Sequence, residues 1–387
     1  MSAIGIVAAL GLIAWVYLIF LHGGFWLMRE REEDYGLAGD HAANWPAVVA
    51  VVPARNEADV LPQSLASLAA QNYPGEFSIV LVDDQSSDGT ADVARRIAKN
   101  AGRKITIVSG AQLPPGWTGK VWAMHQGIAA ASASDTPPRY LLLTDADIGY
   151  EPDVLASLVA RASGEKRVLT SVMAKLRCES FAERALIPAF VFFFKMLYPF
   201  AWVNRKGSMT AAAAGGCMLA ERSALERAGG IQAIRDALID DCTLGKLMKA
   251  QGPVWLGMSK RVFSLRPYPK VEDIRRMVAR SAYAQLRYSP LLLLGTIAGM
   301  ILVYLAPPVL FLVQSYPTSV FAGAAYFLMM IAFQPTLRFY HRSPLWGLAL
   351  PLIAATYLGF ALDSAYQHSA GRGGLWKGRV QAQAGKQ

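Results

Sequence analysis

The chain is poor in charged residues, cysteine and histidine. Only 17% of its 387 residues are charged and 53% are hydrophobic, which is too apolar for an ordinary soluble protein of this length. The three cysteines form no CxxC pair and the five histidines form no cluster, so neither a disulfide framework nor a structural zinc site is supported. A dinucleotide fold, a P-loop and a hydrolase elbow also lose support, because GxGxxG, GxxxxGK[ST] and GxSxG motifs are missing where such folds need them.

The net charge of +10 fits a protein that lies against anionic lipid. Basic and aromatic residues are not interleaved, and there is no zinc spacing or helix-turn-helix pattern, so nucleic acid is not an expected partner.

Apolar stretches bracket a polar middle. Residues 3–21 carry no charge and are followed by an aromatic belt at 22–26; a signal peptide would have a basic start and a cleavage site, so we expect an uncleaved anchor. Three further spans are expected at 291–313, 319–337 and 345–366. The expected division is an anchor at 1–28, a catalytic domain at 29–289, and a membrane block with a basic tail at 290–387.

The charges near these spans do not fit four crossings. If the polar domain is cytoplasmic, the loop with Arg338, His341 and Arg342 lies inside, as the positive-inside rule prefers. Four spans would then put the basic tail with Arg372, Lys377 and Arg379 outside. One expected span is therefore re-entrant or miscounted.

The polar middle alternates short β-rich runs with helical stretches. Strands are expected at 47–52, 77–82 and 104–108 and in the run that ends at Asp145, with helices at 58–71, from about 90, and at 121–131. This order predicts an α/β domain with a mostly parallel sheet.

Polar residues follow the first two expected strands, where open α/β sheets bind ligands. Pro53, Arg55, Asn56 and Glu57 follow the first strand, and either contact a nucleotide or, in the alternative, Asn56 caps the helix while its neighbours are solvated. Three carboxylates follow the second, namely Asp83, Asp84 and Asp88. Ribose and base donors would satisfy them, although Asp88 also suits a purely structural helix start.

Two more features favour a metal-dependent nucleotide site. Asp145 and Asp147 end a buried strand, and a backbone turn at Ala146 would let both reach one divalent ion or its diphosphate ligand. Lys120 lies beside Gly119, where it either contacts a diphosphate or is simply solvated.

Taken together, these motifs resemble family 2 glycosyltransferases with the GT-A type nucleotide-diphospho-sugar fold over about residues 46–260. The matching segments are Val52-Pro53-Ala54-Arg55-Asn56-Glu57, Val82-Asp83-Asp84-x-Ser86-x-Asp88-Gly89-Thr90, Gly119-Lys120, Asp145-x-Asp147 and Ile239-Asp240-Asp241-x-x-Leu244. The resemblance implies inverting sugar transfer from a UDP-sugar or similar donor.

The resemblance also implies roles for single residues. Asp83 and Asp84 would contact base and ribose, Asp145 the nucleotide, and Asp147 a Mg²⁺ or Mn²⁺ ion that stabilises the leaving diphosphate together with Lys120. Asp240 and Asp241 match the family's acidic pair, which makes Asp241 the expected base. The alternative is that the pair caps a helix at 242–250. Residues 211–217 resemble the family's acceptor-side strand, and equally suit a tightly packed strand.

Processive synthases of the family carry a Gln/Arg-x-x-Arg-Trp motif. Here residues 275–281 keep Arg280, an expected diphosphate contact, but Met277 and Ser281 replace the polar residue and the tryptophan. Without the aromatic platform for a growing chain, we expect a single transfer.

A membrane lipid is the expected acceptor, because spans tether the domain at both ends. Two segments are expected at the interface: 187–203, for which a core helix is the alternative, and 271–288. The whole arrangement is similar to the hopanoid-biosynthesis-associated branch of membrane glycosyltransferases. That branch implies a bacterial inner-membrane enzyme whose acceptor is a hopanoid or related lipid. We expect its catalytic domain to face the cytoplasm. A polysaccharide synthase, an idle nucleotide-sugar-binding protein or scaffold, and a transporter are the alternatives.

Overall fold

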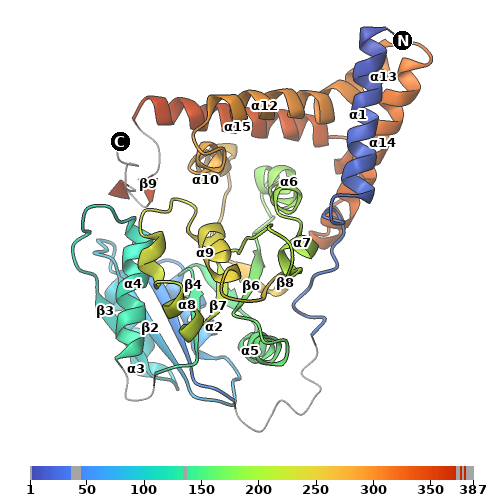
Figure 1. Cartoon of the computed structure of the whole chain (residues 1–387). Coiled ribbons are helices and arrows are strands. Elements are labelled where there is room, and N and C mark those ends of the chain that lie inside the picture. The colour runs from blue at the N-terminus through green and yellow to red at the C-terminus, as the bar shows by residue number, and fades with distance from the viewer. Residues whose placement is uncertain (1, 36–44, 134–136, 372–374, 377–378, 381–387) are drawn as a thin grey trace. The chain divides into compact units, whose positions relative to one another are not determined.

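The structure is a computed structural model that describes residues 2–35, 45–133, 137–371, 375–376 and 379–380 (Figure 1). The chain forms two compact units. The first unit contains Met1–Arg29, Cys178–Ala201 and Tyr268–Gly373, and the second contains Glu30–Arg177, Trp202–Pro267 and Gly374–Gln387.

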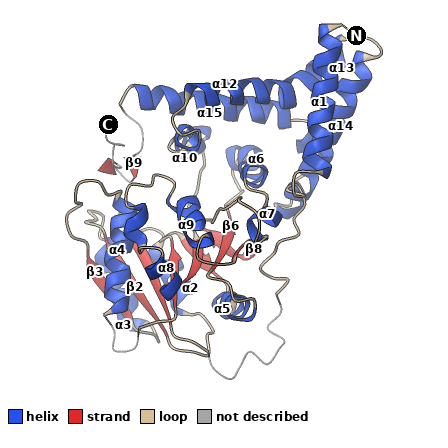
Figure 2. Ribbon diagram, in the orientation of Figure 1, coloured by secondary structure: helices blue, strands red, loops and turns tan. Residues whose placement is uncertain are grey.

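The second unit is built on an eight-stranded sheet (Figure 2). The strand order is β3-β2-β1-β4-β7-β6-β8-β5, and β5 and β7 are the strands that run antiparallel to their neighbours. The strands are β1 (Val48–Ala54), β2 (Phe77–Asp83), β3 (Ile105–Ser109), β4 (Tyr140–Thr144), β5 (Ile148–Tyr150), β6 (Leu169–Lys175), β7 (Cys217–Glu221) and β8 (Val254–Ser264). The predicted α/β class with a mostly parallel sheet is confirmed.

Short helices connect these strands. They are α2 (Leu61–Ala69), α3 (Thr90–Asn100), α4 (Gly119–Ser132), α5 (Val154–Gly164), α8 (Arg222–Arg227), the 3-10 turn η2 (Ile231–Ile234) and α9 (Asp240–Lys249). The central strands are almost continuously buried, since all seven residues of β1 and all five of β4 lie in the interior. Burial on both faces explains why these strands read as unbroken apolar runs in the sequence.

The strand register brings the ends of three strands to one edge of the sheet. Ala54 at the end of β1 is paired with Asp83 at the end of β2, and Val51 is paired with Leu143 near the end of β4. The loops that follow these parallel strands therefore emerge together, as expected for a ligand-binding edge.

The expected strand over 211–217 is wrong for residues 211–216, because β7 begins only at Cys217. The preceding segment bonds to a side chain: Ala214 N donates to Ser171 Oγ (2.9 Å). Helix α9 packs on it so closely that a Cβ at Gly245 would lie 2.6 Å from the carbonyl carbon of Ala212. The absence of a side chain at Gly245 thus lets α9 pack closely against the backbone of this segment.

The first unit consists of helices. They are α1 (Ala3–Phe20), α6 (Phe181–Leu197), α10 (Val271–Ala279), α11 (Ala282–Gln285), α12 (Pro290–Met300), the π-helical turn η3 (Ile301–Leu305), α13 (Ala306–Val313), α14 (Thr318–Phe339), the 3-10 turn η4 (Pro344–Gly347) and α15 (Leu350–Ser369). A short helix, α7 (Phe200–Asn204), crosses the boundary between the units. In the second unit, β9 (Leu375–Trp376) pairs with β10 (Arg379–Val380).

Three described helices are long and apolar enough to cross a membrane: Ala3–Phe20, the continuous α12–η3–α13 stretch Pro290–Val313, and Thr318–Phe339. Helix α15 covers the last expected span but is not among them. Arg372 and Lys377 of the basic tail lie outside the described residues.

Of the two segments expected at a membrane interface, 271–288 and the part of 187–203 up to Ala201 group with the apolar helices of the first unit. Within 187–203, Ile187, Val191 and Phe192 of α6 are buried, which favours the core-helix alternative for this face of α6. The segment 271–288 forms α10 and α11. Its interfacial role, like the expected domain boundaries, stays a prediction.

Candidate active site

The loops after β1 and β2 are joined to each other. Asn56 N donates to Ser86 Oγ, and Ser87 N donates to Asn56 Oδ1, both at 2.9 Å. Helix α2 begins later, after Val60, so Asn56 does not cap it. Pro53 lies within β1, and Arg55 directly after this strand donates to the Asp84 carbonyl.

Asp83 and Asp84 end β2 at this junction. The Asp84 side chain is fully buried, with one carboxylate oxygen 3.9 Å from the Arg55 guanidinium. Asp83 Oδ1 accepts a hydrogen bond from Ser86 N (3.3 Å). Their contacts with a nucleotide stay a prediction.

Asp88 has contacts that suit its structural alternative. Its Oδ2 accepts from Ala58 N and its Oδ1 from Thr90 N, both at 3.0 Å. One carboxylate thus connects the loop after β1 to the start of α3. The contact of Asp88 with the nucleotide-sugar donor stays a prediction. These hydrogen bonds favour the alternative, in which Asp88 holds the start of the helix in place.

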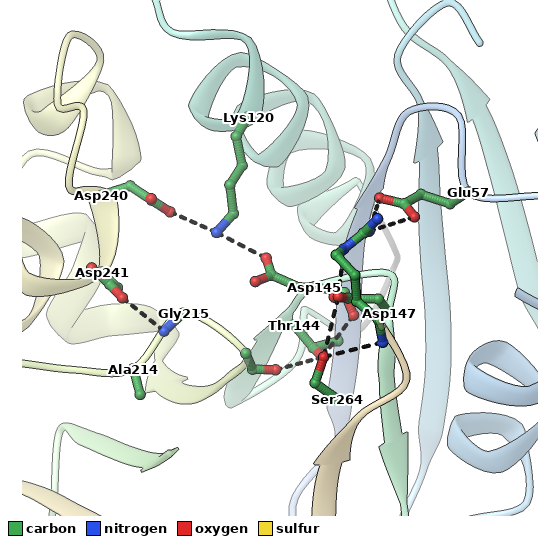
Figure 3. A network of polar contacts seen from close by, with 12 residues as sticks. Glu57, Lys120, Thr144, Asp145, Asp147, Ala214, Gly215, Asp240, Asp241 and Ser264 are labelled. Carbon is green, nitrogen blue, oxygen red and sulfur yellow. Dashed lines mark hydrogen bonds and ion pairs between the residues drawn. The ribbon is translucent and has the colours of Figure 1, made fainter. Parts of the chain in front are cut away.

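The chain turns at Ala146, as expected, but the two carboxylates on either side find different partners. Ile148 N donates to Asp145 O (3.3 Å) across the turn. Asp145 Oδ1 lies 2.8 Å from Lys120 Nζ, whereas Asp147 Oδ2 accepts from Arg266 Nε (2.9 Å) (Figure 3). The turn places the two acids in neighbouring but separate ion pairs.

Lys120 connects the sheet edge to α9. It is the second residue of α4, and its Nζ lies 2.8 Å from Asp145 Oδ1 and 3.0 Å from Asp240 Oδ2 (Figure 3). Burial alone would lower the pKa of Lys120, but the carboxylates of Asp145 and Asp240 raise it above its ordinary value. Burial has the opposite effect on a carboxyl group, and it raises the pKa of Asp145. The solvated alternative for Lys120 is excluded, since its side chain is only 15% exposed.

Asp240 and Asp241 lie in the first turn of α9, where the helix dipole favours negative charge. Asp241 Oδ2 accepts from Gly215 N (3.0 Å) and its Oδ1 from Cys242 N (2.7 Å). Burial, and then the charge of Asp240, raise the pKa of Asp241 to about 6, against the opposing effect of Lys120. A carboxylate with this pKa is ionised at neutral pH and is a better base than an ordinary aspartate.

Gly215 leaves room for both charged groups. A Cβ at this position would lie 3.2 Å from Lys120 Nζ and 3.4 Å from Asp241 Oδ2. With a glycine here, both charged groups approach this backbone position without being displaced.

Arg266 is part of the site but was missed in the sequence. Its guanidinium donates to both carboxylate oxygens of Glu57 (2.7 Å each) and to Asp147. Antiparallel pairing of Ile148 with Ser264 brings the end of β8 beside the turn and so places Arg266 there. The sequence signal was weak: an arginine two residues beyond a strand end.

The remaining predicted residue, Arg280, is the C-cap of α10 in the first unit. It therefore belongs to a different unit from the other predicted site residues, and its diphosphate contact stays a prediction.

The carboxylates fit a metal ion that arrives with phosphates rather than alone. Within the described ranges, no three carboxylate, imidazole or thiol groups gather as a metal site. Magnesium is often held by one or two carboxylates plus substrate phosphates, and Asp145, with a 34% exposed side chain, and Asp147 offer two. These hard oxygen donors suit Mg²⁺ or Mn²⁺.

Comparison with known proteins agrees with the α/β fold of this unit. Residues 49–229 match the family model described as glycosyl transferase family 2. A mannosyltransferase from Pyrobaculum calidifontis, solved with GDP-Man and Mn²⁺, has a similar fold, with a TM-score of 0.54 at 18% identity over 94% of this chain and 99% of that chain.

Two curated relatives match shorter stretches. A PGL/p-HBAD biosynthesis glycosyltransferase of Mycobacterium bovis is 35% identical over 116 residues, which is 30% of this chain and 41% of the relative. A 4,4'-diaponeurosporenoate glycosyltransferase of Staphylococcus haemolyticus is 34% identical over 102 residues, 26% of this chain and 24% of the relative. The chain thus spans less than half the length of these relatives.

Proposed function

We propose that the chain is an inverting glycosyltransferase of family 2, whose family model matches residues 49–229. It moves one sugar from a nucleoside-diphosphate sugar, such as a UDP-sugar, to a hydroxyl group of a membrane lipid. A hopanoid or related lipid is the proposed acceptor class.

One observation carries the proposal. Lys120 bridges Asp145, at the nucleotide-binding edge of the sheet, and Asp240, at the start of α9. The same short region therefore holds a cation suited to a diphosphate and, at Asp241, a carboxylate whose pKa is about 6. A binding protein without catalysis has no need for such a base.

In the proposed reaction, the oxygen of the acceptor hydroxyl attacks the anomeric carbon. Asp241 accepts the proton of this hydroxyl during the attack. The bond from that carbon to the diphosphate breaks, and the diphosphate leaves with the electron pair. Attack from the face opposite the leaving group inverts the anomeric centre. Gly215 N holds Asp241 by a hydrogen bond of 3.0 Å, which fixes the base in orientation.

Charge on the leaving diphosphate is stabilised from the other side of the site. Lys120 supplies a positive charge next to Asp145. A divalent ion, held by Asp145 and Asp147 together with the phosphates, would add Lewis-acid stabilisation. Arg266 keeps Asp147 in place through the 2.9 Å bond to its carboxylate.

A lipid acceptor is supported by the apolar helices that precede and follow the catalytic segment in the chain. We place the enzyme in the bacterial inner membrane with its catalytic unit on the cytoplasmic side, where nucleotide-sugars are available. The loss of the tryptophan platform at Ser281 supports transfer of a single sugar.

The test uses purified full-length protein in detergent, Mg²⁺ or Mn²⁺, a panel of nucleotide-sugars and a bacterial lipid extract. Nucleotide release is read together with lipid mass. A lipid heavier by one sugar supports the proposal and identifies both substrates. A polymeric product would instead indicate a processive synthase, and tight donor binding with no release across all lipids would indicate a binding protein.

A further inference from the structure

Helix α15 was expected to be the last membrane span, yet its second half carries polar anchors. Asp363 forms an ion pair with Arg275 of α10, and Ser364 Oγ accepts from Tyr283 N (3.0 Å). The ring of His368 stacks on Tyr288 with centroids 4.3 Å apart. An ion pair, a hydrogen bond and a ring contact therefore hold this half of α15 against the segment 275–288.

The first half of α15 is fastened to α6. Tyr357 OH donates to Leu186 O (2.9 Å) in a buried hydrogen bond. Just before α15, the ring of Trp346 lies 6.0 Å from that of Phe181, the first residue of α6. The two ends of α15 are thus tied to two different segments of the first unit.

Neither of these segments crosses a bilayer. Helix α6 belongs to a stretch that leaves the second unit after Arg177 and returns to it at Trp202, so both of its ends lie on the same side. Helix α10 begins four residues after Pro267, the last residue of the second unit before this stretch. A helix held at one end by α6 and at the other by 275–288 therefore has both ends on one side.

We propose that α15 is not a span but lies in the plane of the bilayer surface, on the side of the catalytic unit. Helix α12 begins the 24-residue stretch Pro290–Val313 beside it, and this stretch bends at η3 before α13 packs with α1 and α14 (Figure 1). The chain then crosses the membrane three times, through α1, the whole stretch Pro290–Val313, and α14.

Three crossings remove the conflict in the charges. The loop with Arg338, His341 and Arg342 now lies on the same side as the catalytic unit. The C-terminal end of α15, which the basic tail follows in the sequence, lies there too, as the positive-inside rule prefers for a cytoplasmic face.

The partner of the in-plane α15 is one leaflet of an anionic phospholipid bilayer. On α15, Leu352 is 74% exposed and Tyr366 is 61% exposed. Arg276 on the adjacent α10 has a 72% exposed side chain. An exposed leucine and tyrosine beside a basic side chain suit an interfacial helix next to the spans.

Depth in the bilayer tests the proposal without any turnover. In the full chain with its native cysteines replaced, Leu352→Cys and Leu362→Cys are labelled with a fluorophore and reconstituted in phosphatidylglycerol-containing vesicles with nitroxide lipids of known depth. An in-plane α15 gives equal depths, whereas a span separates these sites by about 15 Å. A difference below half that value supports the proposal, and a larger difference overturns it.

A matched control lies in α14, where Val320→Cys and Phe327→Cys are also exposed and should differ by about 10 Å in depth. A second measurement uses an impermeant thiol reagent on sealed vesicles of one orientation. Ser343→Cys and Ser369→Cys, at either end of α15, should label from the same side as Asn100→Cys in the catalytic unit, and Ser315→Cys from the opposite side. Labelling of the two α15 ends from opposite sides would refute the in-plane helix.

Discussion

Replacing Lys120 by methionine should move the pH dependence of turnover by raising the pKa of Asp241. A Cβ at Gly215 would lie 3.2 Å from Lys120 Nζ and 3.4 Å from Asp241 Oδ2. These two atoms are therefore at most about 6.6 Å apart. Methionine keeps most of the side-chain volume but removes the positive charge that lowers the pKa of Asp241.

The size of the shift follows from Coulomb's law. Two unit charges about 6.6 Å apart interact by about 2.5 kcal/mol at an effective dielectric constant of about 20, which corresponds to roughly two pKa units. Partial exposure of the site reduces this effect, so we expect a shift of about one to two units. The pKa of Asp241, about 6 in the parent, would then lie above 7.

The direction in which the pH profile of kcat shifts follows from the role of Asp241 as the base. Asp241 works when deprotonated, so turnover is full above its pKa and falls as the pH decreases through it. The acid limb of the kcat profile should therefore be near pH 6 in the parent and shift toward pH 7 to 8 in Lys120→Met. Part of the activity lost at neutral pH should return at pH 9.

Asp240→Asn serves as the opposing control. Asp240 raises the pKa of Asp241, so its neutralisation should shift the acid limb to lower pH. The assay is kcat at saturating donor and acceptor between pH 5 and 9 for the three proteins. Shifts in the same direction, or an unchanged limb in Lys120→Met, would refute the reasoning.

Three further predictions concern the same unit. Arg266→Met leaves the carboxylates of Glu57 and Asp147 without their cation and should destabilise folding by about 3 kcal/mol, measured by denaturant unfolding; an unchanged midpoint contradicts the ion cluster. Gly215→Ala pushes a methyl group against Lys120, so kcat should fall about tenfold while stability changes little; parent-like kcat contradicts the close packing. A chelator should abolish transfer, and calorimetry should detect metal binding only when nucleotide is present; tight binding of metal alone would disprove a phosphate-completed site.

Much of the sheet was predictable because its central strands are buried on both faces. The runs at 47–52 and 77–82 became Val48–Ala54 and Phe77–Asp83, and the polar residues after them meet at one edge as expected. The turn at Ala146 was also expected, although Asp145 and Asp147 enter separate ion pairs on either side of it.

The errors and omissions have non-local causes. Whether 211–216 forms a strand depends on Ser171 and on a helix that packs through Gly245, far along the chain. Arg266 reaches Asp147 only because β5 pairs antiparallel with β8. Local patterns carry no information about either pairing. Hydropathy alone likewise suggested a span at 345–366, whereas the structure gives that helix polar anchors at Asp363.

The central claim is that Asp241 is the base of a sugar transfer to lipid. The most direct measurement compares the parent with Asp241→Asn, reading donor affinity by calorimetry and glycosylated lipid by mass spectrometry in the same preparation. We predict that the variant binds the donor as the parent does but forms no heavier lipid. Glycosylated lipid formed by the variant at the parent rate would contradict the assignment.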